Sequence, residues 1–375
     1  MSTATTTVLH VIPGLGLGGA EAMLTNLATA PGRRTAPIVV DLLKGGAHAE
    51  QLRAAGIPLY EFGVRGPVGF LLALRRLARL IGELRPDVVQ GWMYYGDLAA
   101  ALALGRSGRR GQTRLYWGVR CSDMDVARYG LALRYAVRAC RRLSHLPDAV
   151  IANSQAGARV HRALGYRARA FEVIENGIDS GRFRPDAAAR SVARKALGIA
   201  SDASVAILPA RVDPMKDHEG FLAALDRLPD VTALTVGLGT DRLPARANLI
   251  GLGPRGDMAA LYNAADLMVL SSAYGEGFST VLGEAMACGL PAVVTDVGDS
   301  ARIVGETGTV VPPRDPMALA QAIEAFFAKP AVGRAALGQA ARARMVEDFS
   351  LERALARFET LYLAGKVDRT IVGAA

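Results

Sequence analysis

Two glutamates stand eight residues apart where a glycine-rich loop leads into an expected helix. The segment SSAYGEGFSTVLGEAMACGLPAVVTDVG, residues 271–298, places Glu276 in the loop and Glu284 within the helix. Backbone amides at a helix start attract anions, and nearby carboxylates accept hydrogen bonds from sugar or ribose hydroxyls. The amides concerned belong to Ser279, Thr280 and Val281. The pattern predicts a site for a phosphorylated sugar compound.

Carboxylates beside a diphosphate need compensating cations. Arg211 and Lys216 lie in PARVDPMKDHEG, directly after an expected strand at 204–210. The carboxyl ends of parallel strands meet at one edge of a sheet, so these cations are expected near the two glutamates.

A second glycine loop supports a competing interpretation. Gly14, Gly16 and Gly19 follow an expected strand at 8–12 and precede a helix. Asp41 ends the next strand about 20 residues on, where a dinucleotide-binding fold has its ribose-binding acid. These residues alone favour an NAD(P)-dependent oxidoreductase. Under either interpretation, the glycines let the backbone approach an anion at a helix start.

Apolar runs alternate with helical-period stretches along the whole chain, which predicts an α/β fold with parallel sheets. In the first half the expected strands are 8–12, 36–41, 87–92, 114–119 and 149–154. In the second half they are 204–210, 233–238, 248–252, 266–272, 291–296 and 308–312.

The segment 171–185, FEVIENGIDSGRFRP, ends the first series with a strand, an Asn-Gly turn and a proline. It predicts a boundary between an acceptor-side domain at 1–180 and a nucleotide-sugar-binding domain at 181–349. A helical pattern at 350–364 follows the second domain, and we expect it to pack back on the first.

Together these segments resemble the retaining family-4 (group 1) glycosyltransferases. GEGFSTVLGEAMACGLP is similar to that family's E-x7-E motif, and Arg211 with Lys216 is similar to its diphosphate clamp. HVIPGLGLGGAE resembles its first loop, and VIENGID resembles its interdomain turn. The resemblance covers nearly the whole chain in the right order. It implies the GT-B fold, in which two Rossmann-like domains face a central cleft.

The resemblance also implies roles for individual residues. Glu276 would contact donor-sugar hydroxyls near the reacting carbon, and Glu284 would hold the ribose. Arg211 and Lys216 would neutralise the leaving diphosphate without a metal ion or other cofactor, and the anomeric configuration would be retained. The remaining donor contacts would come from Gly18, Gly19, Gly277, Phe278 and the three amides, with the base near Gly237 and Leu252.

Two features depart from the family pattern. Relatives often carry histidines after the strand that reads DVVQGWMYYGDLAA here, whereas this chain has Trp92 and Tyr95. Tyr95 would hydrogen-bond a sugar and Trp92 would stack on one. Asp123 and Asp125 form a DxD pair, the metal signature of the other glycosyltransferase fold. We interpret that pair as a chance occurrence, because every other marker indicates GT-B.

Charge and composition limit the classes of protein and the locations that the sequence allows. With 51% hydrophobic and 21% charged residues the chain is typical of a folded globular protein, not a disordered one. Residues 1–180 hold 23 Lys+Arg against 13 Asp+Glu, or +10, and the remainder sums to −1. Basic amphipathic stretches at 70–85 and 131–145 favour an anionic membrane surface over nucleic acid, for which no binding module is present. The sequence shows no secretory signal or spanning segment, which predicts a cytoplasmic protein, peripheral on the inner face of the membrane.

The predicted activity is hexosyl or N-acetylhexosaminyl transfer from a nucleotide diphosphate sugar to a glycan or lipid-linked hydroxyl, as in cell-envelope polysaccharide synthesis. We favour UDP-sugars over GDP-sugars. Two alternatives remain open from the residues. One is the oxidoreductase, which leaves Arg211, Lys216 and both glutamates unexplained. The other is a non-catalytic sugar-nucleotide-binding subunit, for which an altered Glu276 would be the expected sign.

Overall fold

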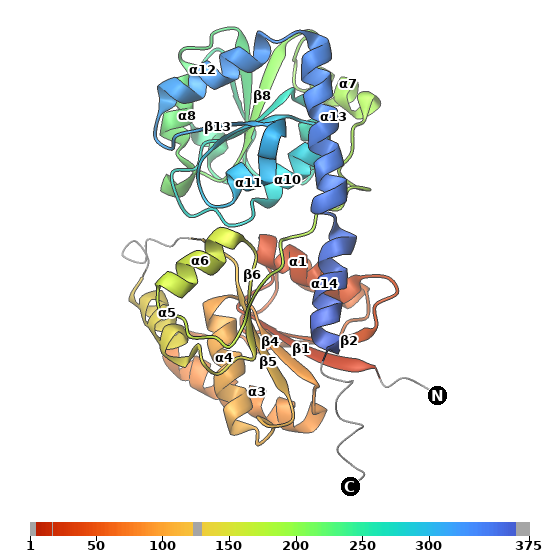
Figure 1. Cartoon of the computed structure of the whole chain (residues 1–375), viewed down its shortest axis with the longest axis vertical. Helices are drawn as coiled ribbons and strands as arrows, with labels where there is room; N and C mark the ends of the chain where they lie inside the picture. Colours follow the sequence, from red (N-terminus) through yellow and green to blue (C-terminus); the bar gives the residue numbers. More distant parts are fainter. Residues whose placement is uncertain (1–4, 17, 123–129, 365–375) are drawn as a thin grey trace. The chain divides into compact units, whose positions relative to one another are not determined.

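The chain divides into two compact units in the computed structural model, which describes residues 5–16, 18–122 and 130–364 (Figure 1). Unit 1 comprises the residues up to Asn176 together with those from Glu352 onward, and unit 2 runs from Gly177 to Leu351. The boundary after Asn176 lies within the segment 171–185.

Unit 1 is built on a seven-stranded sheet with the order β3-β2-β1-β4-β5-β6-β7, in which every pairing is parallel. Its strands are β1 (Thr6–Ile12), β2 (Thr35–Asp41), β3 (Leu59–Glu61), β4 (Val88–Gly91), β5 (Arg114–Val119), β6 (Ala149–Ala152) and β7 (Phe171–Val173). Its helices are α1 (Gly19–Thr29), α2 (Ala47–Ala54), α3 (Gly66–Leu84), α4 (Met93–Arg106), α5 (Leu131–Leu143), α6 (Gln155–Ala163) and α14 (Leu351–Leu363).

Unit 2 is built on a six-stranded parallel sheet with the order β10-β9-β8-β11-β12-β13. Its strands are β8 (Ser204–Pro209), β9 (Val231–Val236), β10 (Leu249–Gly251), β11 (Leu267–Leu270), β12 (Ala292–Thr295) and β13 (Thr309–Val311). Its α-helices are α7 (Ala187–Ala196), α8 (His218–Leu225), α9 (Met258–Ala264), α10 (Thr280–Ala287), α11 (Ser300–Val304), α12 (Pro316–Phe327) and α13 (Ala331–Asp348). Short 3-10 helices are η2 (Pro214–Lys216), η3 (Thr240–Arg242) and η4 (Gly305–Thr307).

The predicted α/β class is confirmed in both units. Strands β4, β6, β11 and β12 are buried along their whole length, which explains why each reads as an apolar run without alternation. Edge strand β3 was not predicted, because it has only three residues. The expected strand 248–252 is observed as the shorter β10, Leu249–Gly251, which like β3 lies at an edge of its sheet.

Helix α14 packs on the sheet of unit 1. The Tyr362 hydroxyl donates to Gln90 Oε1 on β4, and the Phe358 ring stacks on Trp92 at a centroid distance of 6.1 Å. Helices α3, α4 and α5 share one hydrophobic core on the sheet (Figure 1). Within the part of the chain that the structure describes, no helix combines the length and apolar composition that a membrane crossing requires.

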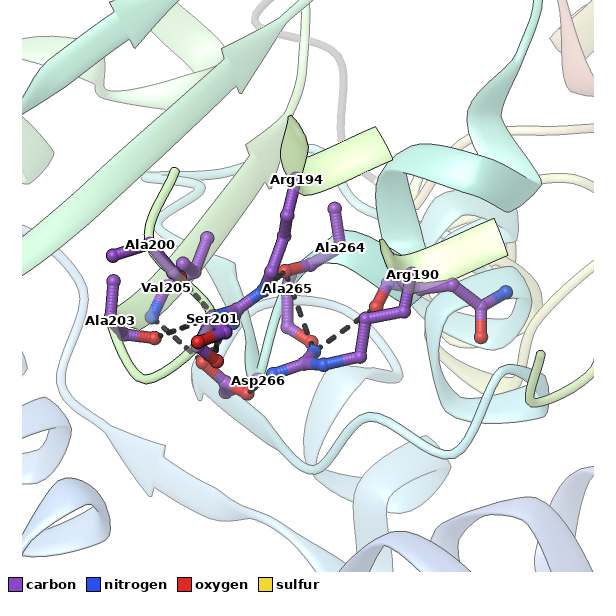
Figure 2. Close-up of polar contacts among 10 residues, drawn as sticks. Arg190, Arg194, Ala200, Ser201, Ala203, Val205, Ala264, Ala265 and Asp266 are labelled. Carbon is purple, nitrogen blue, oxygen red and sulfur yellow. Dashed lines mark hydrogen bonds and ion pairs between the residues drawn. The ribbon is translucent and has the colours of Figure 1, made fainter. Parts of the chain in front are cut away.

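A buried arginine holds the amino ends of two strands of unit 2 together (Figure 2). Arg194 on α7 donates to Ala264 O at the end of α9 and to Asp266 Oδ2 just before β11, both at 2.9 Å. Its Nη1 also donates to three carbonyls of the loop before β8, those of Ala200, Ser201 and Ala203. Asp266 also accepts from Arg190 Nη2 at 2.6 Å.

Candidate functional site

The loops that carry the predicted cations and glutamates meet at the switch point of unit 2. Strand β8 lies between β9 and β11, and the chain leaves β8 first toward β9 and later returns on the other side as β11. Ligands of open α/β sheets bind outside the carboxyl ends of strands at such a point. Two hydrogen bonds of 2.8 Å join the loops after β8 and β11, from Ser271 Oγ to Lys216 O and from Ala273 N to Met215 O.

Glu276 and Lys216 form a buried ion pair at this edge. Lys216 Nζ contacts Glu276 Oε1, and the two side chains are only 13% and 7% exposed. Ser272 Oγ donates to the same Oε1 at 2.5 Å. Among the residues that the structure describes, none donates to Glu276 Oε2. One carboxylate oxygen is therefore fixed by the protein and the other is not.

The backbone of Glu276 is held from the other side by Gly298. Gly298 has a φ of +65°, and a β-carbon there would overlap the carbonyl of Glu276. Only glycine fits this close approach without strain. The loop after β12 therefore helps to fix Glu276.

Arg211 lies at the same edge but is more open. Its side chain is 55% exposed, and its guanidinium binds Asp213 Oδ2, with Nη2 at 3.0 Å and Nε at 3.2 Å. Gly237, after β9, has a φ of +141°, and a β-carbon there would overlap the backbone of Ala210. A bound diphosphate would compete with Asp213 for Arg211, whereas Lys216 is already aligned with Glu276.

Glu284 lies on the second turn of α10, with the Tyr262 hydroxyl donating to its Oε2 at 3.0 Å. Burial raises the pKa of Glu284 to about 7, while the Tyr262 hydrogen bond and the Arg182 charge act in the opposite direction. Its other oxygen, Oε1, accepts no hydrogen bond from any described residue. As for Glu276, one oxygen is held and one is open.

Other predicted donor contacts differ in how their side chains lie. Ser279 is the N-cap residue of α10, and its hydroxyl caps no amide of the helix. Phe278 is 4% exposed and packs on Phe349 at a ring distance of 5.4 Å, so its side chain belongs to the core. Any role of Phe278 toward a donor is limited to its backbone. Gly277 precedes it in the same loop, and Leu252 follows β10 at the carboxyl edge.

The glycine loop of unit 1 is held by the loop after β2 and by the first turn of α2. Leu43 N donates to Pro13 O at 3.1 Å, and His48 N donates to Leu15 O at 3.2 Å. Gly18 is the N-cap residue of α1, which begins at Gly19. Asp41 is fully buried and its Oδ1 accepts from Leu43 N at 2.9 Å. Its Oδ2 accepts no hydrogen bond from a described residue but is also buried, so neither oxygen of this acid is exposed for a ribose, which weakens the oxidoreductase interpretation.

The stacking role predicted for Trp92 is wrong, because the side chain has no exposed surface. Its Nε1 donates to His10 Nδ1 at 3.2 Å, and the Arg120 guanidinium covers the ring at 4.4 Å. Burial lowers the pKa of His10 to about 3, so this histidine accepts as a neutral ring. Tyr95 is partly buried against the core of unit 1, and its predicted sugar contact stays a prediction.

Two residues of the site were missed from the sequence. Ser272 is the last residue of an expected strand, and Tyr262 lies in a helix 22 residues before Glu284. Neither residue belongs to a sequence motif that would indicate its contact with a glutamate. The pair Asp123 and Asp125 lies outside the described residues. Within residues 5–16, 18–122 and 130–364, no three His, Cys, Asp or Glu side chains gather as a metal-ligand set.

Comparison with known families gives two matches that follow one another along the chain. Residues 17–182 match the model described as Glycosyltransferase Family 4, and residues 203–329 match Glycosyl transferases group 1. A D-inositol 3-phosphate glycosyltransferase of Mycobacterium avium is 31% identical over 252 residues, or 60% of this chain and 58% of the relative. Its Mycobacterium tuberculosis counterpart is 33% identical over 224 residues, 55% of this chain and 46% of the relative. The chain thus spans about half the length of the curated relatives it matches.

Solved structures match over almost the whole chain. Anabaena HepE in complex with UDP-glucose has a TM-score of 0.80 and 26% identity, with 95% of this chain and 99% of that chain covered. Sucrose-phosphate synthase from Thermosynechococcus elongatus has a TM-score of 0.77 at 19% identity, covering 96% and 98%. The second likeness is one of fold alone.

Proposed function

Because this chain belongs to the group 1, family 4 glycosyltransferases and has their GT-B fold, we propose that it transfers a sugar from a nucleotide diphosphate donor to an acceptor hydroxyl. The observation that carries the proposal is the Lys216–Glu276 pair at the switch point, with Glu276 Oε2 left open. The donor is a UDP-sugar, with a hexosyl or N-acetylhexosaminyl group transferred with retention. Support for UDP comes from HepE, whose structure contains UDP-glucose.

The roles of the residues follow from their charges. Negative charge develops on the leaving diphosphate, so Lys216, Arg211 and the amino end of α10 would stabilise it electrostatically. Glu276 would accept hydrogen bonds from sugar hydroxyls through Oε2, and Glu284 would accept from the ribose through Oε1. Gly18 and Gly19 would approach the diphosphate through their backbone. The leaving phosphate would itself take the proton of the acceptor hydroxyl.

We expect slow hydrolysis of UDP-hexoses or UDP-N-acetylhexosamines, and little of the matching GDP-sugars, when the protein is incubated with each donor and no acceptor. Released nucleotide diphosphate is the measurement. The turnover should persist in EDTA, because protein cations supply the positive field that a metal would otherwise provide. Glu276→Gln serves as the inactive control. Activity that vanished in EDTA and returned with Mn²⁺ would contradict the metal-free proposal. Failure with every sugar nucleotide would contradict the function itself.

The exposed residues of α3 and α5 in unit 1 support binding to an anionic membrane surface. On α3 the exposed residues change along the helix from apolar to basic, with Val68 71% exposed, followed by Leu71 and Leu72 and then by arginines. Helix α5 repeats the order, with Leu131 and Tyr135 exposed before its basic end. The exposed arginines are Arg75, Arg76 and Arg79 on α3 and Arg138, Arg141 and Arg142 on α5. We propose a lipid-linked or growing polysaccharide acceptor, bound where the protein is peripheral on the inner face of the membrane.

Binding to anionic vesicles at low salt should fall strongly when Arg75, Arg76 and Arg79 are changed to Gln. Each cation near an anionic surface contributes about 1 kcal/mol, so losing three should weaken partitioning about 100-fold. Co-sedimentation measures it. A matched control changes three exposed cations of unit 2, Arg227, Arg242 and Lys329, to Gln and should bind like wild type. Wild-type protein that ignores anionic vesicles at low salt would contradict a membrane role.

A further inference from the structure

Tyr262 is the buried partner of the glutamate assigned to the ribose. It lies on α9 with no exposed surface, and its ring packs edge-on against Phe183 at 6.0 Å. A buried tyrosine hydroxyl requires a hydrogen-bond partner, and here the partner is Glu284 Oε2 at 3.0 Å. We propose that Tyr262 is a positioning residue of the donor site, which fixes one oxygen of Glu284 so that Oε1 is presented to the ribose of the nucleotide. The inference rests on the proposed function.

The geometry gives Glu284 little other support. The helix backbone beside it is tightly packed, since a β-carbon at Gly283 would lie 2.7 Å from the Ile178 side chain. That packing does not fix the carboxylate. The carboxylate itself extends from the helix on three rotatable bonds, and ordering it costs side-chain entropy. A rigid tyrosine already packed in the core removes much of that freedom before a nucleotide binds.

Tyr262 also affects whether Glu284 is ionised. Burial is the largest influence and raises the pKa of Glu284 to about 7, whereas the Tyr262 hydrogen bond and then the Arg182 charge lower it. Arg182 lies on the segment before α7 and is exposed. At the C-cap of α10, one turn after Glu284, burial raises the pKa of Cys288 to about 12, so that thiol is neutral. Arg182 is the charge that acts on Glu284, whereas Arg342 on α13 donates to the carbonyls of Phe183 and Ala287 and lowers the pKa of Cys288.

The sign of the pH effect follows from hydrogen bonding. Both ribose hydroxyls donate, so the ionised carboxylate is the better acceptor, and nucleotide affinity should rise as pH increases through the pKa of Glu284. Loss of the Tyr262 hydroxyl removes the hydrogen bond that lowers the pKa of Glu284. The midpoint in Tyr262→Phe should therefore move to higher pH.

The test is UDP affinity measured by calorimetry from pH 6 to pH 9, with the same ligand throughout so that its own titration cancels between variants. Wild type should gain affinity with a midpoint near pH 7. Tyr262→Phe should bind about tenfold more weakly at pH 7, as expected for one hydrogen bond to a charged acceptor, and should recover toward wild type at pH 9. Glu284→Gln should lose this pH dependence.

Arg182→Gln tests the charge separately, because Arg182 is exposed and the Tyr262 hydrogen bond stays in place. The Arg182 guanidinium also lies 5.0 Å from the Phe183 ring that packs on Tyr262, so the thermal transition of this variant is measured as well. Arg182→Gln should move the midpoint of the UDP affinity curve to higher pH while the Tyr262–Glu284 hydrogen bond is kept. A Tyr262→Phe protein that is folded, as shown by its thermal transition, and that keeps the wild-type affinity and midpoint would overturn the proposal. If Tyr262→Phe does not fold, Glu284→Asp is the replacement test, because the shorter carboxylate cannot keep both the Tyr262 hydrogen bond and its reach toward the ribose. Wild-type UDP affinity in Glu284→Asp would then overturn the proposal. Wild type that binds neither UDP nor GDP at any pH would overturn the proposed function as well.

Discussion

Replacing Lys216 with methionine is expected to slow sugar transfer by about 10² to 10³-fold, the usual effect of removing one preorganised group that stabilises developing charge. Lys216 Nζ contacts Glu276 Oε1, and both side chains are nearly buried. The substitution therefore removes the cation opposite the leaving diphosphate and also leaves Glu276 without its counter-charge. Steady-state kinetics with a UDP-sugar give the kcat, and urea unfolding gives the free energy of unfolding.

The stability of the variants separates the two consequences. Breaking a buried pair from one side costs about 3 kcal/mol or more, because the remaining charge stays buried. The double variant Lys216→Met with Glu276→Gln should recover much of that loss, since no uncompensated charge remains, but should not recover transfer. Ser272→Ala removes only the second donor to Oε1 and should have a smaller effect on kcat. A Lys216→Met enzyme within threefold of wild type would contradict the role given to this cation.

The fold and the position of the site could be predicted from the sequence because both depend on strand order along the chain. Lys216 and Glu276 are 60 residues apart, yet each follows a buried strand. Strands β8 and β11 are neighbours at the switch point, so their loops meet. The rule that parallel strands expose their carboxyl ends at one edge was sufficient to bring the two residues together.

The direction of individual side chains could not be predicted. Trp92 comes directly after β4, and Met93 next to it has a φ of +59°, a backbone state that an apolar pattern does not reveal. The indole turns into the core because His10, Phe358 and Arg120 surround it, and these come from distant parts of the sequence. The direction of the Phe278 side chain could not be predicted for a similar reason, since its partner Phe349 lies 71 residues later.

Arginine is rarely buried in folded proteins, and Arg194 is an exception that its sequence context does not indicate. It lies on α7 among residues typical of an exposed amphipathic helix, but is only 4% exposed. Its environment consists mainly of backbone carbonyls, which any sequence supplies. No residue type at a fixed spacing therefore indicates the cluster in Figure 2.

Arg194→Met is expected to lower the free energy of unfolding of unit 2 by about 3 to 5 kcal/mol, as for other buried charged groups that lose a partner. One guanidinium satisfies four carbonyls and one oxygen of Asp266. A methionine fills part of the volume but leaves those carbonyls, at the end of α9 and in the loop before β8, without a donor. Urea denaturation followed by circular dichroism measures the change.

Two matched variants on the same helix show whether burial is the cause. Lys195→Met, at an exposed position, should change stability by no more than about 0.5 kcal/mol. Arg190→Met should be intermediate, because Arg190 shares Asp266 with Arg194 but its side chain is 34% exposed. Since the cluster lies at the amino ends of β8 and β11, opposite the edge that carries Lys216 and Glu276, folded Arg194→Met protein should keep the wild-type affinity for UDP. An unfolding midpoint equal to that of wild type would instead mean that the cost of burying the guanidinium offsets all five of its hydrogen bonds.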